Sequence, residues 1–140
     1  MKSYAVIFFG FIILVFSVLN CTGVFPPNDP IPSSTLKFDK TLFLAYHDTL
    51  FNYEENAWIT LDSLISDYRC PVPSECKWEG NAEFAFAFNS IGFHLNTSAS
   101  FRRDTTLSGY HIELLYASPY PHMDSVYTAE QYVAEIKVSK

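Results

Sequence analysis

The stretch from Ala82 to Asn89 places phenylalanine at every second position, with small or polar residues between. Successive side chains of a β-strand point to opposite sides of the sheet, so Phe84, Phe86 and Phe88 share one face. A face made of three phenyl rings has to be removed from water, and it is predicted to be core. This strand therefore constrains the chain to a layered β fold.

The same period of two recurs along the rest of the chain. Further strands are predicted at residues 41–46, 49–53, 58–65, 91–96, 100–104, 110–116 and 132–138. Within 58–65 the alternation shifts after Leu61, which is consistent with a β-bulge. No stretch has good helical periodicity. Seven or so short strands at this spacing predict an all-β fold, a single antiparallel β-sandwich of the immunoglobulin-like kind.

The N-terminus is a different kind of segment. One cation at Lys2 precedes sixteen uncharged residues at 4–19, and Cys21 follows. This pattern is typical of a signal peptide. The uncharged run is short for a membrane-spanning helix and has few charged residues at its ends. Residues 1–20 are predicted to be a signal peptide, 21–34 the N-terminus of the mature chain with a proline-rich tether, and 35–140 the β-sandwich domain.

The sequence Val18-Leu19-Asn20-Cys21 resembles the lipobox of bacterial lipoproteins. In that family the cysteine becomes the first residue of the mature chain and carries acyl chains on its thiol and amine. The resemblance implies lipidation at Cys21, a membrane as partner through the lipid anchor, and a place in the cell envelope, at the outer membrane of a Gram-negative bacterium. An uncleaved membrane anchor and an ordinary secreted protein are the alternatives.

Two further cysteines enclose a short proline-bearing loop. Cys70 and Cys76 are separated by five residues that include Pro71 and Pro73. In an exported chain such a pair favours a disulfide. A zinc site would need two more ligands, and no histidine stands at ligand spacing from either cysteine. A Cys-x-x-Cys redox pair is absent from the sequence. We expect a disulfide, and neither a metal nor a cofactor.

The cysteine pair belongs to a larger motif, D-x-R-C-P-x(4)-C-x-W-x-G-x-A. Its members are Asp67, Arg69, Cys70, Pro71, Cys76, Trp78, Gly80 and Ala82. From about Leu36 to the C-terminus, the order of features resembles a family of small bacterial domains of uncharacterised function, often lipoproteins. The resemblance implies a β-sandwich with a bridge between Cys70 and Cys76, and it transfers no activity.

The loop inside this motif is the candidate binding loop. Its candidate residues are Tyr68, Arg69, Pro73, Ser74, Glu75 and Trp78. We expect Trp78 to cover the disulfide or cap the open end of the sandwich, with a ligand-stacking role as the alternative. Arg69 is expected to pair with Asp67 or to stack on Trp78. Exposure of the aromatic residues would favour a binding role, and their burial a structural one.

Charge and residue pattern exclude several function classes. The chain carries 9 Lys and Arg against 15 Asp and Glu, and it has no basic stripe, so no nucleic-acid partner is expected. The pairs His47-Asp48 and His122 with Asp124 are only neighbours in predicted turns, so no enzyme is predicted. We expect a non-catalytic binding or interaction module for a protein or glycan. A structural accessory of the cell envelope and an exported protease inhibitor are the alternatives.

The anchor is directly testable. We expect Cys21→Ala to release the protein from membranes or to mislocalise it, because the acyl chains can no longer be attached. Metabolic labelling with palmitate should mark the wild type and the control Cys76→Ala, but not Cys21→Ala. An unlabelled wild type would contradict lipidation.

Overall fold

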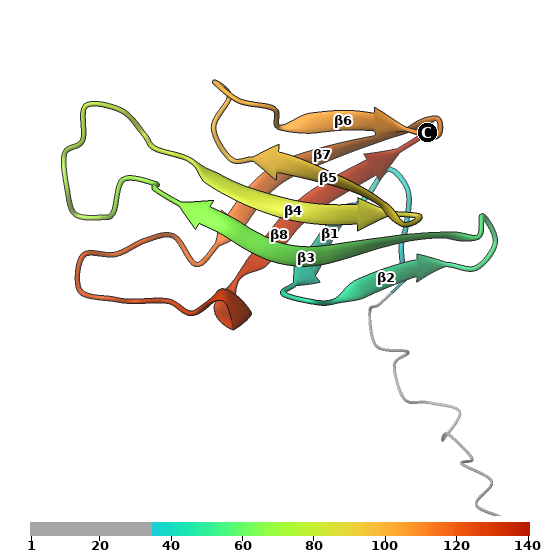
Figure 1. Ribbon diagram of the computed structural model, residues 1–140, viewed down its shortest axis with the longest axis horizontal. Coiled ribbons are helices and arrows are strands. Elements are labelled where there is room, and N and C mark those ends of the chain that lie inside the picture. Colours follow the sequence, from blue (N-terminus) through green and yellow to red (C-terminus); the bar gives the residue numbers. More distant parts are fainter. Residues whose placement is uncertain (1–34) are drawn as a thin grey trace, which may run out of the picture. The chain divides into compact units, whose positions relative to one another are not determined.

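The computed structural model describes residues 35–140, which form two four-stranded antiparallel sheets packed face to face (Figure 1). The first sheet has the order β2 (Thr49–Asn52), β3 (Ala57–Asp67), β4 (Ala82–Phe88) and β5 (Ile91–Asn96). The second has the order β1 (Thr41–Ala45), β8 (Val133–Ser139), β7 (Tyr110–Ser118) and β6 (Asp104–Leu107). A single 3₁₀ turn, η1 (Ala129–Gln131), precedes β8. The predicted all-β sandwich is confirmed, with eight strands.

Chain order and sheet order agree within each layer. Strands β2 to β5 follow one another across the first sheet, and β6 to β8 do so across the second, where β1 is added beside β8. The chain changes sheet twice, between β1 and β2 and between β5 and β6. The fold is therefore immunoglobulin-like in its two antiparallel layers, but its strands run in a meander where the immunoglobulin fold has Greek-key connections.

Two tight hairpin turns set where the strands end. Asn89 and Ser90 join β4 to β5 with φ of 47° and 68°, and Ser108 and Gly109 join β6 to β7 with φ of 51° and 84°. Positive φ at both central residues matches the right-handed twist of the paired strands.

The sixth strand does not lie where the sequence pattern placed it. A strand was predicted at 100–104, but β6 runs from Asp104 to Leu107 because the turn that follows sets its register against β7. Residues 97–103 form a loop that is closed by backbone bonds from Phe101 N to Ser98 O and from Asn96 N to Arg102 O, of 3.1 and 2.8 Å. The prediction of a strand at 100–104 was wrong.

The aromatic face of β4 forms the centre of the core. Phe84, Phe86 and Phe88 are all buried, as the alternation predicted. The opposite sheet contributes the aliphatic side chains of Ile112, Leu114, Ala134, Ile136 and Val138. Tyr132 and Tyr110 also reach across, with ring centroids 6.0 Å from Phe84 and 5.1 Å from Phe88. The two layers are thus joined by aromatic contacts at both ends of β4.

Bulges interrupt the ladders in two of the longest strands. The register of β3 against β4 shifts between Leu61 and Ser63, which confirms the predicted bulge, and shifts again between Leu64 and Ser66. In β7 the register shifts between Leu114 and Tyr116. Bulges bend and twist a strand, so the ends of β3 and β7 are redirected as they leave the sandwich.

The domain is anchored at its start by Leu36, which is completely buried and donates from its backbone N to Phe51 O at 2.8 Å. Thr35 forms a parallel bridge with Phe51. The predicted signal peptide, the lipidated Cys21 and the tether lie outside the described residues. Within residues 35–140 there is no helix long and apolar enough to cross a membrane.

The position of the core can be tested with a matched pair of variants, one at a buried and one at an exposed phenylalanine. Phe86→Ala should lower the free energy of unfolding by about 3 to 5 kcal/mol, because it leaves a cavity between the sheets. Phe43→Ala removes an exposed ring from β1 and should change stability by only about 0.5 kcal/mol. Urea unfolding of both variants tests this, and equal losses would contradict the placement of the core.

Candidate functional site

Two long loops leave the sandwich at the same end (Figure 1). One connects β3 to β4 through residues 68–81, and the other connects β7 to β8 through residues 119–132. Backbone hydrogen bonds join them, from Val72 N to Pro121 O and from Met123 N to Val72 O, each of 3.0 Å. We call residues 68–81 and 119–132 together the loop end.

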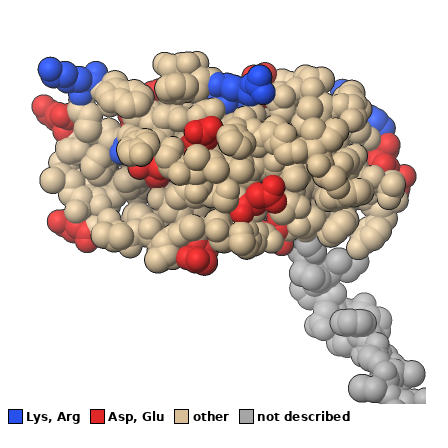
Figure 2. All heavy atoms as spheres, viewed as in Figure 1, with Lys and Arg blue, Asp and Glu red and all other residues tan. Residues whose placement is uncertain are grey.

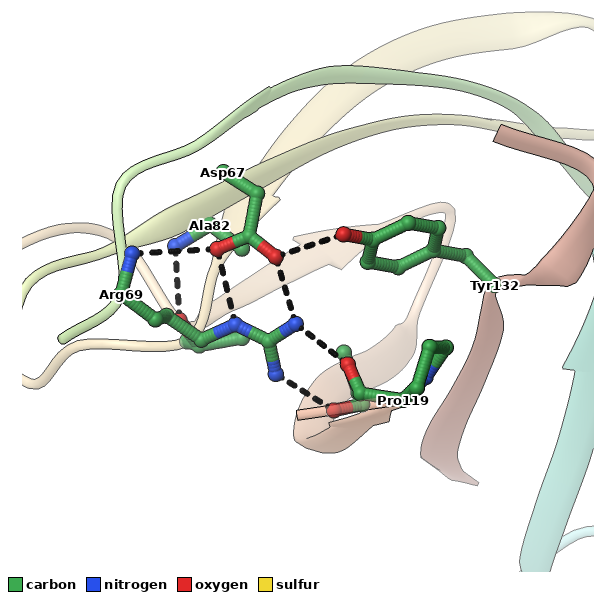
Figure 3. A network of polar contacts seen from close by, with 7 residues as sticks. Asp67, Arg69, Ala82, Pro119 and Tyr132 are labelled. Atoms are coloured by element: carbon green, nitrogen blue, oxygen red, sulfur yellow. Dashed lines mark hydrogen bonds and ion pairs between the residues drawn. The ribbon is translucent and has the colours of Figure 1, made fainter. Parts of the chain in front are cut away.

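A buried polar network lies beneath the loop end (Figure 3). The Nε and Nη2 atoms of Arg69 donate to the two carboxylate oxygens of Asp67, at 2.9 and 2.6 Å. The same guanidinium donates from Nη1 to Ala117 O at 2.6 Å and from Nη2 to Pro119 O at 2.7 Å. The Tyr132 hydroxyl donates to Asp67 at 2.8 Å. One side chain from the first loop thereby binds the backbone where the second loop begins.

The charges of this network are held by one another. Burial opposes ionisation of Asp67, but hydrogen bonds from Arg69 and from Tyr132 outweigh it and lower the pKa of the carboxyl below its usual value. Burial, together with the hydrogen bond to Asp67, raises the pKa of the Tyr132 hydroxyl to about 12. The rings of Tyr120 and Tyr132 lie 5.0 and 5.9 Å from Cζ of Arg69. The guanidinium is therefore enclosed by acceptors and aromatic rings.

These contacts decide between the two roles considered for Arg69. It pairs with Asp67, and the ring closest to it is that of Tyr120, not that of Trp78. Arg69 is buried, so among the candidate binding residues it holds the loops in place and does not present its charge to a partner.

The base of the β3–β4 loop continues the hairpin beyond the two strands. Tyr68 N donates to Asn81 O at 2.7 Å, and Cys70 N donates to Glu79 O at 2.8 Å. Gly80 lies opposite with φ of +79°, and a Cβ there would lie 2.0 Å from Tyr68 O. Only glycine fits this position, because the conformation and the close approach of the backbone both exclude a side chain.

The tip of the loop is closed covalently. Cys70 and Cys76 form the predicted disulfide, with Cα atoms 5.9 Å apart. Ser74 N donates to Pro71 O at 3.0 Å, and the Ser74 hydroxyl donates to the same carbonyl. Ser74 is half-buried by these contacts, whereas Pro73 and Glu75 are exposed. The loop is therefore held at its base by backbone hydrogen bonds, at its tip by the disulfide, and against the second loop by the contacts of Arg69.

Five apolar side chains of the loop end face solvent. The exposed fractions are 75% for Tyr68, 47% for Val72, 55% for Trp78, 62% for Met123 and 96% for Val126. Trp78 is more than half exposed, so it is not packed into the open end of the sandwich, one of the two positions expected for it. Arg69 and Tyr120 already occupy the space beneath the loop, so the indole is left outside.

Two of the histidines each lie near a carboxylate. His94 is exposed on β5, and its Nδ1 lies 2.9 Å from a carboxylate oxygen of Glu83. His122 Nδ1 lies 3.9 Å from Asp124 on an exposed segment. Among the described residues, no three His, Cys, Asp or Glu side chains gather as ligands for a metal ion.

Comparisons with protein-family models, curated proteins and solved structures give no match to this chain. The class of protein is therefore defined by its own fold and site: a small all-β sandwich whose loop end is held by a disulfide and a buried ion pair, with exposed apolar side chains on top.

The ion pair yields a pH-dependent prediction. Asp67→Asn should lower the free energy of unfolding by about 3 to 5 kcal/mol near neutral pH, because the buried Arg69 charge loses its carboxylate. Since the pKa of Asp67 is lower in the folded chain, this contribution is complete above the unfolded value near 3.8 and is lost as pH falls through the folded pKa.

Urea unfolding of the wild type and Asp67→Asn between pH 7 and pH 2 measures the effect. The two stabilities should converge as the acid limit is approached, and a constant difference would contradict the assignment. Tyr132→Phe removes one hydrogen bond and keeps the ion pair, so it should cost only about 1 kcal/mol at neutral pH.

The disulfide should matter less to stability than the core. Cys70→Ser combined with Cys76→Ser should lower the free energy of unfolding by about 2 kcal/mol, because the bridge closes a short loop. The variant should keep the circular dichroism of a β-sheet protein. Two reactive thiols in the purified wild type under non-reducing conditions would refute the bridge.

Proposed function

We propose that this protein is an envelope lipoprotein and a non-catalytic binding module, whose loop end contacts a protein partner. The proposal depends on one observation: Trp78 and Tyr68 are exposed on a loop whose backbone is fixed. Exposed apolar side chains gathered in one place on a monomer mark an interaction surface.

The fixed backbone favours binding. The disulfide, the backbone hydrogen bonds on either side of Gly80 and the contacts of Arg69 hold the β3–β4 loop before any partner arrives. A loop that is already ordered loses little conformational entropy on association, so more of the contact energy appears as affinity. Tyr68 and Trp78 are the residue types that most often dominate the energetics of protein interfaces.

The composition of the surface favours a protein over a glycan. Val72, Met123 and Val126 add aliphatic and thioether surface to the two aromatic rings. Methionine and aromatic residues are enriched in protein interfaces. The face in Figure 2 carries scattered acidic side chains and no large basic patch, which agrees with the net charge of −6. A partner with basic groups around an apolar contact would complement this surface.

The location of the module in the cell envelope is part of the proposal. Lipidation at Cys21 supplies several acyl chains, each contributing about 0.8 kcal/mol per buried methylene, which is enough to hold a protein durably at a membrane. The tether has four prolines between Phe25 and Ser33, a composition that favours an extended and stiff linker. The sandwich would then present its loop end to other components of the cell envelope, at the outer membrane of a Gram-negative bacterium.

A photo-crosslinking experiment tests the binding surface. A photoreactive amino acid at position 78 of the full-length lipidated protein should capture a discrete partner in intact cells. The matched control is position 53, because Tyr53 is also exposed and follows β2 at the opposite end of the sandwich (Figure 1). Equal capture at both positions, or none at position 78, would contradict the proposal and favour a structural accessory.

The energetic prediction uses the same partner. Trp78→Ala should weaken its binding by about thirtyfold, as expected for an aromatic residue central to an interface. Tyr53→Ala should leave binding unchanged. Because both side chains are exposed, neither change should alter stability by more than about 0.5 kcal/mol. A partner captured as a glycan, identified by mass spectrometry of the crosslinked species, would replace the protein in the proposal.

A further inference from the structure

A cavity of about 120 Å³ opens beside the base of the β3–β4 loop. Gly80 forms part of its wall, and the residues after β5 and around the bulge of β7 complete it. The polar and aromatic lining comes from Arg69, Glu79, Thr97, Ser98, Tyr116 and Tyr120. The cavity is thus lined by residues of β7, by the residues that follow β5 and by both loops of the loop end.

The charge that this lining offers to a ligand is negative. Glu79 is exposed, and its Oε1 accepts the Ser98 hydroxyl at 2.8 Å. In the described part of the chain no second hydrogen bond to this carboxylate is found. The positive charge of Arg69 is already neutralised by two hydrogen bonds to Asp67. A carboxylate held in place by a neighbouring hydroxyl is left to face the opening.

The walls around this carboxylate are aromatic. Tyr116 is exposed at the bulge of β7, and Tyr120 is partly buried with the Arg69 guanidinium 5.0 Å from its ring centroid. An ammonium or guanidinium group is attracted both to a carboxylate and to the face of an aromatic ring, and more strongly where water is excluded. The Tyr116 ring is the one whose exposure suits this contact.

The size of the cavity distinguishes between ligands. Sites for whole small molecules are roughly 300 to 1,000 Å³. At about 120 Å³ this cavity suits the end of one long side chain. We infer that it binds a lysine or arginine side chain of the protein partner, with Glu79 accepting its hydrogen bonds and the Tyr116 ring in contact with its cationic group. This inference rests on the proposed function and names the chemistry of its partner.

The inference is tested first with a model compound. Nα-acetyl-lysine amide is titrated into the lipidated full-length protein in detergent, and backbone amide shifts are followed by NMR. Saturable shifts should centre on residues 79–80, 97–98 and 115–116. Nα-acetyl-norleucine amide has an apolar side chain of similar length without the charge, and it should bind about tenfold more weakly or not at all. Glucose is titrated in the same way as a test for a glycan site. Equal binding of the lysine and norleucine compounds, no shifts at these residues, or saturable shifts with glucose and not with the lysine compound would overturn the inference.

A matched pair of variants separates the cavity from general acidity. Glu79→Gln keeps an acceptor for the Ser98 hydroxyl and removes the charge, so affinity for the lysine compound should fall about tenfold. Glu75→Gln removes an exposed charge from the same loop and should leave that affinity within about twofold. An undiminished affinity in Glu79→Gln would refute the assignment.

The proposed binding role of the loop end and the proposed cavity site can be refuted independently. If position 78 captures a partner but the lysine compound does not bind, the loop end is a binding surface and the cavity is not its basic-residue site. If the lysine compound binds the cavity but no partner depends on Trp78, the cavity stands as a site and the role of the loop end as the interface is refuted.

Discussion

The arrangement of the loop end depends on the guanidinium group of Arg69. Its donors reach a carboxylate two residues away and two backbone carbonyls 48 and 50 residues further along the chain. Without these bonds, the two loops would be joined mainly by the pair of backbone bonds at Val72. A buried charge is costly unless fully paired. The network meets this condition by giving Arg69 a bidentate carboxylate, two carbonyls and two aromatic rings, and by giving Asp67 the hydroxyl of Tyr132 as a further donor.

The residues that stabilise the fold are separate from the exposed residues of the loop end for which a binding role is proposed. The core lies between the sheets, where Phe84, Phe86 and Phe88 meet the aliphatic side chains of β7 and β8. The disulfide restricts the backbone of the loop, and Gly80 allows that backbone to approach Tyr68 closely. Neither the disulfide nor Gly80 adds to the core. Trp78 can therefore be exposed on a rigid support, since the fold does not need its burial.

The sequence pattern was most successful where a local rule applies. Alternation located the buried face of β4 and the shift at Leu61 located a bulge. It misplaced the sixth strand, because residues 100–104 carry enough extended character to suggest a strand, whereas pairing with β7 selects Asp104–Leu107. It also could not assign strands to sheets. The turn at His47 lies between strands of different sheets, since β1 pairs with β8 and β2 pairs with β3.

The sequence by itself determined the β architecture, the aromatic core face and the pair of cysteines that closes the loop, because side-chain alternation and a short covalent ring depend on neighbouring residues. The tertiary structure alone decided that Arg69 is buried, that Trp78 is exposed, and that Glu79 and Tyr116 share a cavity. Arg69 and Tyr120 are partners under the loop because the end of β7 brings two backbone carbonyls and the Tyr120 ring to the same end of the sandwich as Arg69. Those groups lie about 50 residues along the chain from Arg69, so no local sequence pattern contains that information.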